Sequence, residues 1–335
     1  MSASVSSTLD TLWFTRCPVP TATGIAADRG WLADEFAADG LTVRSLQDAG
    51  PDVPRDRHFT HALTGLFREG GNVPALWARA SGEPTRLIGL TWIEERQAIL
   101  VRADDRDRIA QPADLAGLRV AIPRRDIAID FWRAMALAGF HGALSAAGLG
   151  LGDVTPVEVT AAPSAGQWIA ELEALRDGSV DAVYVKGALA VEAAAAHGAV
   201  IGVDLDAFDD PTVRINNGTP RPVTVHQDLL DQHPDVVARF LRVLIEAADW
   251  AAANPADLAR ILAAETGAGA EGVAGAYRGA ASSDLHLDLS AHRLELLARQ
   301  ERFLHEQGFL AARVDIAAWV ASEPLAAARA LAAER

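Results

Sequence analysis

Cysteine and lysine are almost absent from this chain of 335 residues, which contains one of each, Cys17 and Lys186. A single cysteine excludes a disulfide framework and any metal site built from several cysteines. No run of 18 apolar residues occurs, which excludes a membrane-spanning helix. The first ten residues carry neither a basic nor an apolar segment, so we expect no secretory signal and a cytoplasmic location.

Positive charge is also scarce, because 30 Lys and Arg face 45 Asp and Glu, for a formal net charge of −15. This balance argues against nucleic acid and anionic membranes as partners. An anionic small molecule would need a local basic site. Hydrophobic residues make up 50% of the chain and charged residues 22%, as in globular proteins, and the length suits two lobes.

Short apolar strands alternate with helices through the first two thirds of the chain, and helices follow from about residue 235. This order predicts an α/β fold with mostly parallel sheets and a helical C-terminal region. We place lobe 1 at residues 1–102 and 216–335, and an inserted α/β lobe 2 at 103–215. Ligands of such sheets bind at the carboxyl ends of strands.

Cys17 lies between a predicted strand, Thr11–Arg16, and a predicted helix, Thr21–Asp34. A thiol at the N-terminus of a helix is stabilised as thiolate by the helix dipole and by nearby N–H groups. Such a thiol is a candidate nucleophile. The alternative is a buried structural cysteine, and the turn makes the two interpretations about equal.

A second candidate segment begins at His58-Phe59-Thr60-His61 and continues through a predicted helix, His61–Arg68, to Gly70-Gly71. The two histidines could bind zinc, but no third ligand has a suitable spacing, so we expect no metal. A histidine can instead orient a cysteine or exchange its proton. Arg68 offers a planar fork for an anion with two oxygens, and the glycines allow close approach of backbone N–H groups. Taken alone, Arg68 would be assigned to a solvated helix face.

Three longer stretches resemble the periplasmic-type solute-binding proteins, specifically the branch that binds nitrate, sulfonates, taurine and thiamine precursors. They are Asp114–Pro123 (DLAGLRVAIP), Leu175–Val185 (LRDGSVDAVYV) and His233–Leu262. This resemblance implies a two-lobed type II fold with a cleft between the lobes. It says little about activity.

The cysteine segment and the histidine segment together resemble the aromatic sulfinate desulfinases, hydrolases that are built on the same fold. The resemblance implies that Cys17, His58 and Arg68 are catalytic, and that Gly71 and Phe59 contact the substrate. Further residues expected around the substrate are Gly70, Thr15, Thr60, His61, Arg124 and Lys186, and for Arg124 and Lys186 exposure at the surface is an equal alternative. Of these, Thr15, His61, Arg124 and Lys186 depart from the pattern of the family, which leaves the identity of the sulfinate open.

The resemblance implies a C–S hydrolase that needs no cofactor, acts on a small aromatic sulfinate and works as a monomer. Cys17 could attack the sulfinate sulfur as a thiolate, or protonate the ipso carbon as a thiol. Two alternatives use the same fold. A binding protein of a sulfonate or nitrate transporter would require export, and a thiamine-pyrimidine synthase would require a cysteine-rich iron-binding motif.

Overall fold

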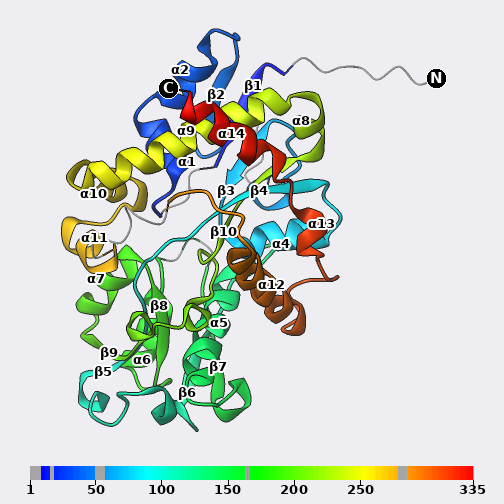
Figure 1. Cartoon of the computed structure of the whole chain (residues 1–335). Helices are drawn as coiled ribbons and strands as arrows, with labels where there is room; N and C mark the ends of the chain where they lie inside the picture. The colour runs from blue at the N-terminus through cyan, green and yellow to red at the C-terminus, as the bar shows by residue number, and fades with distance from the viewer. Residues whose placement is uncertain are drawn as a thin grey trace.

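The computed structural model describes residues 9–15, 19–49, 57–162, 164, 166–277 and 285–334. They form two lobes, lobe 1 with residues 9–91 and 221–334 and lobe 2 with residues 97–204. The lobes lie one above the other in Figure 1 and are joined by two segments, 92–96 and 205–220. In the described part of the chain, no helix is both long and apolar enough to cross a bilayer.

Lobe 1 contains a sheet with the strand order β2-β1-β3-β10-β4. The strands are β1 (Thr11–Phe14), β2 (Thr42–Ser45), β3 (Leu66–Glu69), β4 (Thr85–Thr91) and β10 (Arg221–His226). Strand β1 pairs in parallel with β2 and β3, whereas the returning strand β10 is antiparallel to both β3 and β4. Because β10 enters from the second connecting segment, its first residues lie beside the junction of the lobes.

Helices cover this sheet and continue to the C-terminus, as the sequence predicts. They are α1 (Ala22–Asp28), α2 (Trp31–Ala37), α3 (Arg57–Thr60), α4 (Asn72–Ala80), α8 (Gln227–Gln232), α9 (Pro234–Ala253), α10 (Pro255–Thr266), α11 (Ala270–Tyr277), α12 (Ala291–Glu306), α13 (Ile316–Trp319) and α14 (Glu323–Ala333). The longest, α9, packs against α1, α2 and α14, and its apolar side lies in the core. Its Phe240 stacks on Phe67 of β3, with ring centroids 3.7 Å apart.

Two local predictions for lobe 1 are wrong. The segment predicted as helix His61–Arg68 contains strand β3 instead, because all four residues of Leu66–Glu69 are buried between β1 and β10. Tertiary pairing overrides the local preference there. The helix predicted over Thr21–Asp34 is two helices, α1 and α2, separated at Gly30, whose φ of 77° lies in the left-handed region that favours glycine.

Lobe 2 contains two linked sheets, β8-β5-β9 and β6-β7. Its strands are β5 (Gln97–Arg102), β6 (Arg119–Arg124), β7 (Thr155–Thr160), β8 (Val183–Lys186) and β9 (Ala199–Asp204), and its helices are α5 (Phe131–Ser145), α6 (Ile169–Arg176) and α7 (Ala188–Ala196). A bridge from Val120 to Ala182 joins β6 to the segment that leads into β8. Single-turn helices η1 (Ala103–Asp105), η2 (Pro112–Leu115), η3 (Leu151–Asp153), η4 (Leu205–Ala207) and η5 (Pro211–Arg214) occur in the loops.

The pairing of β5 shifts the predicted boundary between the lobes. Strand β5 is antiparallel to β8 and β9 and therefore belongs to lobe 2, whereas a boundary after residue 102 assigns it to lobe 1. The expectation of mostly parallel sheets holds for β1, β2, β3, β6 and β7 but not for β5 and β10.

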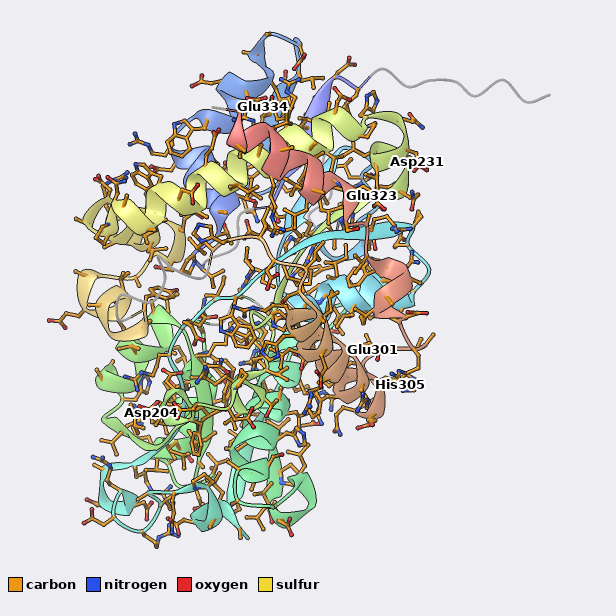
Figure 2. All side chains as sticks on the ribbon, in the orientation of Figure 1. Asp204, Asp231, Glu301, His305, Glu323 and Glu334 are labelled. Atoms are coloured by element: carbon orange, nitrogen blue, oxygen red, sulfur yellow. The ribbon has the colours of Figure 1, made fainter. Side chains whose placement is uncertain are left out.

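The lobes contact each other on two sides. Helix α11 packs on α7, and α4 packs on α5. In Figure 2 the labelled Glu301 and His305 mark α12, and Asp204 marks the end of β9 in lobe 2. Separate apolar clusters fill lobe 1 and lobe 2, and a third lies where α4, α5 and α12 meet.

Candidate functional site

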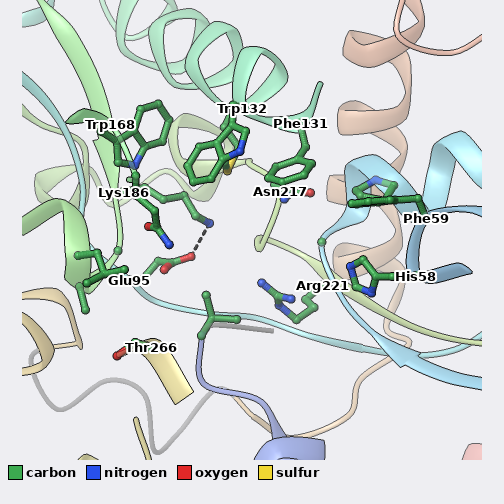
Figure 3. Close-up of a pocket in the computed structure, with 18 of the residues that line it drawn as sticks. His58, Phe59, Glu95, Phe131, Trp132, Trp168, Lys186, Asn217, Arg221 and Thr266 are labelled. Carbon is green, nitrogen blue, oxygen red and sulfur yellow. Dashed lines mark ion pairs between the residues drawn. The ribbon is translucent and has the colours of Figure 1, made fainter. Parts of the chain in front are cut away.

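A pocket of about 200 Å³ lies between the lobes, where the two connecting segments cross (Figure 3). Lobe 1 lines it from α3, β3 and the start of α4, and lobe 2 from α5, the turn before α6, and the β8–α7 junction. The connecting segments add Glu95 and Asn217, and β10 adds Arg221. Ligand sites occur preferentially at such junctions of domains.

Arg68 holds the lobe 1 side of the pocket together. Its side chain on β3 is about 1% exposed. Nε donates to the carbonyl of His58 at 3.0 Å, and Nη2 donates to the carbonyl of Gly71 at 3.1 Å. These bonds fasten α3 and the N-terminus of α4 to the central strand. The guanidinium lies against Gly70, where a Cβ atom would come within 2.7 Å of Cζ.

Gly71 precedes α4 and lies against the amide of Asn217 from the second connecting segment. A Cβ atom at Gly71 would lie 2.3 Å from Asn217 Oδ1, so a larger residue must displace that side chain. The same Oδ1 accepts a hydrogen bond from the N–H of Val73 at 2.9 Å, and the carbonyl of Asn217 accepts one from Asn72 at 2.7 Å. The second connecting segment thus caps the N-terminus of α4.

His58 and His61 lie in different environments. His58 lines the pocket, and burial, followed by the charges of Arg68 and Arg221, holds its pKa well below the usual 6.5. His61 lies outside the pocket lining, and its Nε2 is 2.9 Å from Thr224 Oγ1 on β10. Burial, followed by the charge of Arg68, lowers the pKa of His61 to about 3. Both imidazoles are therefore neutral at pH 7.

An aromatic row forms the opposite side of the pocket. Phe59 stacks on Phe131 at 6.1 Å, Phe131 lies 5.4 Å from Trp132, and Trp132 meets the edge of Trp168 at 5.2 Å between ring centroids. Figure 3 shows these four side chains in sequence along one side, with Arg221 across from them and His58 beside Phe59. Trp168 has φ of 62°, which is unusual for a bulky residue. Such strain persists where surrounding packing fixes it, often at functional sites.

A charged corner closes the lobe 2 end of the pocket. Lys186, the last residue of β8, forms a buried ion pair with Glu95. Burial lowers the pKa of Lys186, while Glu95 acts in the opposite direction. Arg221 faces the same corner: a Cβ atom on Gly218 would lie 3.0 Å from Lys186 Nζ and 3.2 Å from Arg221 Nη2.

Several buried pocket nitrogens have no hydrogen-bond partner among the described residues. They are Nδ1 of His58, Nε1 of Trp168, and both Nε and Nη1 of Arg221. Buried polar groups in folded proteins are almost always hydrogen-bonded, and leaving one unsatisfied costs about 1–3 kcal/mol. The nitrogens of Trp168 and Arg221 can only donate. The pocket is therefore suited to a ligand that accepts hydrogen bonds and has an aromatic body.

The structure brings five of the predicted site residues to this pocket: His58, Phe59, Arg68, Gly71 and Lys186. Gly70 lies behind the Arg68 guanidinium, and Thr15, Thr60 and His61 do not line the pocket. Cys17 lies outside the described residues. The roles assigned to these side chains stay predictions.

The structure places Arg124 elsewhere, contrary to the expectation that it contacts the substrate. Its side chain is 64% exposed and pairs with Glu158 on the neighbouring strand β7 at 2.8 Å. The next residue, Arg125, turns inward and pairs with buried Glu171, but it does not line the pocket either.

Within the described ranges, no group of three or more His, Cys, Asp or Glu side chains is arranged to hold a metal ion. His58 and His61, the pair considered as zinc ligands, lie in different surroundings. His58 faces the pocket, whereas His61 hydrogen-bonds to Thr224.

Residues 21–258 match the family model described as NMT1/THI5 like, which covers more than half of the chain. The chain belongs to the NMT1/THI5-like family. Among curated proteins, this family member is 28% identical to 2′-hydroxybiphenyl-2-sulfinate desulfinase of Rhodococcus erythropolis, over 95% of this chain and 93% of the relative. The predicted resemblance to the aromatic sulfinate desulfinases is confirmed.

Solved structures agree with that assignment. A crystal structure of DszB, a cysteine-to-serine mutant in complex with biphenyl-2-sulfinic acid, matches with a TM-score of 0.74 and 25% identity, over 96% of this chain and 99% of that one. The periplasmic aliphatic sulphonate-binding protein SsuA from Escherichia coli matches with a TM-score of 0.69 and 17% identity, over 93% of this chain and 92% of that one. The predicted two-lobed, periplasmic-binding-protein-like fold is confirmed.

Sequence reasoning about this family member missed Arg221, Asn217, Glu95, Phe131 and Trp132, all of which line the pocket. Arg221 lies between Pro220 and Pro222 at the return from lobe 2, and this local sequence does not by itself indicate a pocket residue. The aromatic pair on α5 carries no signal either, because apolar residues at helical spacing are usually core.

Proposed function

We propose that this protein is an arylsulfinate desulfinase, which hydrolyses the C–S bond of an aromatic sulfinate to the arene and sulfite. One observation carries the proposal: Arg68, His58 and Gly71, the residues of a single sequence motif, border one buried pocket beside a row of aromatic rings. A relative named as a desulfinase of this kind aligns along almost the whole chain and supports it.

The two sides of the pocket suit the two halves of such a substrate. Guanidinium groups bind a two-oxygen anion through paired hydrogen bonds, and an aromatic ring packs on other rings by stacking or edge contacts. Arg68 and the backbone at Gly71 would hold the sulfinate oxygens and stabilise the charge that develops on them as the C–S bond breaks. The rings of Phe59, Phe131 and Trp132 would hold the arene.

The reaction consumes one water molecule: a proton is transferred to the ipso carbon, and the sulfur leaves as SO2, which water converts to sulfite. Cys17 would supply that proton as a thiol, or attack the sulfur as a thiolate and form an intermediate that water resolves. His58, neutral because of burial and the neighbouring arginines, would accept or relay the proton. No cofactor is required by either route.

The position of Cys17 in the sequence supports this role. Val19, two residues later, lines the pocket, and Thr15, two residues earlier, follows β1 and bonds through its N–H to Phe67 beside Arg68.

Release of sulfite from benzenesulfinate and biphenyl-2-sulfinate tests the proposal. We expect turnover by the wild type and a loss of at least about 1,000-fold in the Cys17→Ser variant, because serine is both a weaker acid and a weaker nucleophile. Melting temperatures of the two proteins should agree, since the substitution exchanges only sulfur for oxygen.

The same assay separates the second candidate, a binding protein for a sulfonate-like anion, which is suggested by the fold shared with SsuA. Tight binding of an intact sulfinate or sulfonate by calorimetry, without any sulfite release, would exclude the desulfinase and favour the transport protein. Equal turnover by wild type and Cys17→Ser would leave the activity but remove Cys17 from its mechanism.

A further inference from the structure

The pocket has two polar ends joined by one aromatic row. At one end, His58 and Phe59 are neighbours in contact, with ring centroids 5.1 Å apart, and Arg68 bonds to the His58 carbonyl. At the other end, Trp168 lies near Lys186, which pairs with Glu95 (Figure 3). The proposed sulfinate site accounts for the first end only. The second end has no role in C–S cleavage.

Arg221 reaches the second end, while its charge also acts on His58 at the first end. Its Nη2 and the Nζ of Lys186 flank the same point at Gly218, as the position of a Cβ atom there shows. Arg221 is 3% exposed, and among the described residues its Nε and Nη1 have no hydrogen-bond partner. Two cations therefore meet at this corner with one described carboxylate, Glu95, between them.

A buried guanidinium without a counter-ion is costly, and natural sites of this kind bind anions. A hydroxyl group on the ligand would satisfy one hydrogen bond but would not balance the charge. A carboxylate or a similar acidic group would accept two hydrogen bonds from the Arg221 fork and lie beside Lys186.

We propose that the substrate is a dianion, an aromatic sulfinate whose ring carries a second acidic group, of the carboxylate class, bound by Arg221 and Lys186. This inference rests on the proposed desulfinase function for the first acidic group. The aromatic row sets the path between the two ends, so the ring lies across Phe131 and Trp132 with one acid directed to each end.

The inference is tested by comparing sulfite release from benzenesulfinate with release from its three carboxylated derivatives, the ortho, meta and para isomers of carboxybenzenesulfinate. We expect the best isomer to exceed benzenesulfinate by about 10- to 100-fold in kcat/KM, the range of one to two charge-assisted hydrogen bonds. Equal values for the plain and carboxylated substrates, or a preference for hydroxylated over carboxylated rings, would overturn the dianion assignment and leave the desulfinase proposal intact.

Binding of unreactive analogues separates failure of the inference from failure of the proposed function. Calorimetry should show at least one benzenedicarboxylate isomer binding about tenfold or more tightly than benzoate. That preference in a protein without any sulfite release would support the second acid site and sink the desulfinase. No preference would overturn the second acid site whatever the turnover.

Variants assign the effect to the corner. In Arg221→Gln, the ratio of kcat/KM for the carboxylated substrate to kcat/KM for benzenesulfinate should fall to about threefold or less. Because Lys186→Met alone breaks the buried ion pair with Glu95, the double variant Lys186→Met/Glu95→Gln removes both charges of that pair and should lose most of the preference. Arg260→Gln, an exposed arginine paired with Asp28 in lobe 1, is the matched control. A preference that survives in both corner variants would overturn the assignment.

Discussion

The lobe 1 and lobe 2 sides of the pocket are built in opposite ways. The lobe 1 side comes mainly from one short stretch, residues 58–74, which is tied together by the hydrogen bonds of Arg68 to two backbone carbonyls. The lobe 2 side is assembled from α5, the residue before α6, and the end of β8, which meet only in the folded lobe. Polar groups that can handle an oxyanion dominate the first side, and rings dominate the second.

The comparison assigns chemistry to the lobe 1 side and recognition of the ring to the lobe 2 side. Substitutions on the first side should reduce kcat, because interactions with developing charge are strongest in the transition state. Substitutions on the second side should act mainly on KM, because an arene is held equally before and during the reaction.

Among substitutions on the two sides of the pocket, the largest effect should follow from Arg68→Met, with a loss of about 100- to 1,000-fold in kcat for sulfite release. Arg68→Lys keeps the positive charge but not the planar guanidinium. Its melting temperature should therefore be closer to that of the wild type than its kcat is. Arg260→Met provides an exposed control. Melting temperatures separate the two roles of Arg68, since its loss also leaves the carbonyls of His58 and Gly71 without a donor. A loss below tenfold would break the assignment of chemistry to lobe 1.

The lobe 1 side of the pocket can be predicted from the sequence better than the lobe 2 side. His58, Phe59, Arg68 and Gly71 are close in the chain, so they form a motif that can be recognised in a single sequence. Trp168 and Arg221 are brought to the pocket by pairings that cross tens of residues, which no local pattern encodes. The fold follows from alternating elements, but β3 was concealed because its burial on both faces removes the alternation that marks a strand.

A second prediction concerns pH and the packing of the lobe 1 side. In the unfolded chain His58 and His61 titrate near 6.5, whereas burial lowers the folded pKa of His61 to about 3 and that of His58 well below 6.5. Below pH 6.5 the unfolded chain therefore binds more protons, so stability falls as pH falls. Between pH 7.5 and 5 we expect His61 to reduce the free energy of unfolding by about 2 kcal/mol, and His58 to reduce it further.

Urea unfolding at the two pH values measures that loss, and His61→Asn should remove the part of about 2 kcal/mol that His61 contributes. Asparagine suits the positive φ of 57° at this position and does not titrate. His292→Asn, at an exposed position on α12, serves as the control. An unchanged pH dependence in His61→Asn would show that the segment opens to water near neutral pH.

A smaller effect is expected on the lobe 2 side, from Trp132→Ala. Loss of the indole removes contacts with the ring and should raise KM about tenfold while kcat changes by less than about threefold. Trp250→Ala is a matched control, because Trp250 is also half-buried and makes an edge contact with Trp31, but it lies outside the pocket lining. A larger fall in kcat than rise in KM would place lobe 2 in the chemistry and erase the contrast between the two sides.

The smallest effect should come from Arg124→Gln, which tests the sequence prediction that the structure does not support. Arg124 and Arg125 are adjacent and identical in type, yet the first pairs with Glu158 in solvent and the second pairs with Glu171 at 2.6 Å, with both side chains of the second pair buried. Exposed pairs contribute at most about 1 kcal/mol, whereas breaking a buried pair costs about 3–5 kcal/mol. We therefore expect kcat/KM of Arg124→Gln to stay within about twofold of wild type, and Arg125→Gln to unfold at markedly lower temperature. A tenfold loss of kcat/KM in Arg124→Gln would mean that this loop moves over the substrate, so that lobe 2 contributes a second positive charge besides Lys186 to the site.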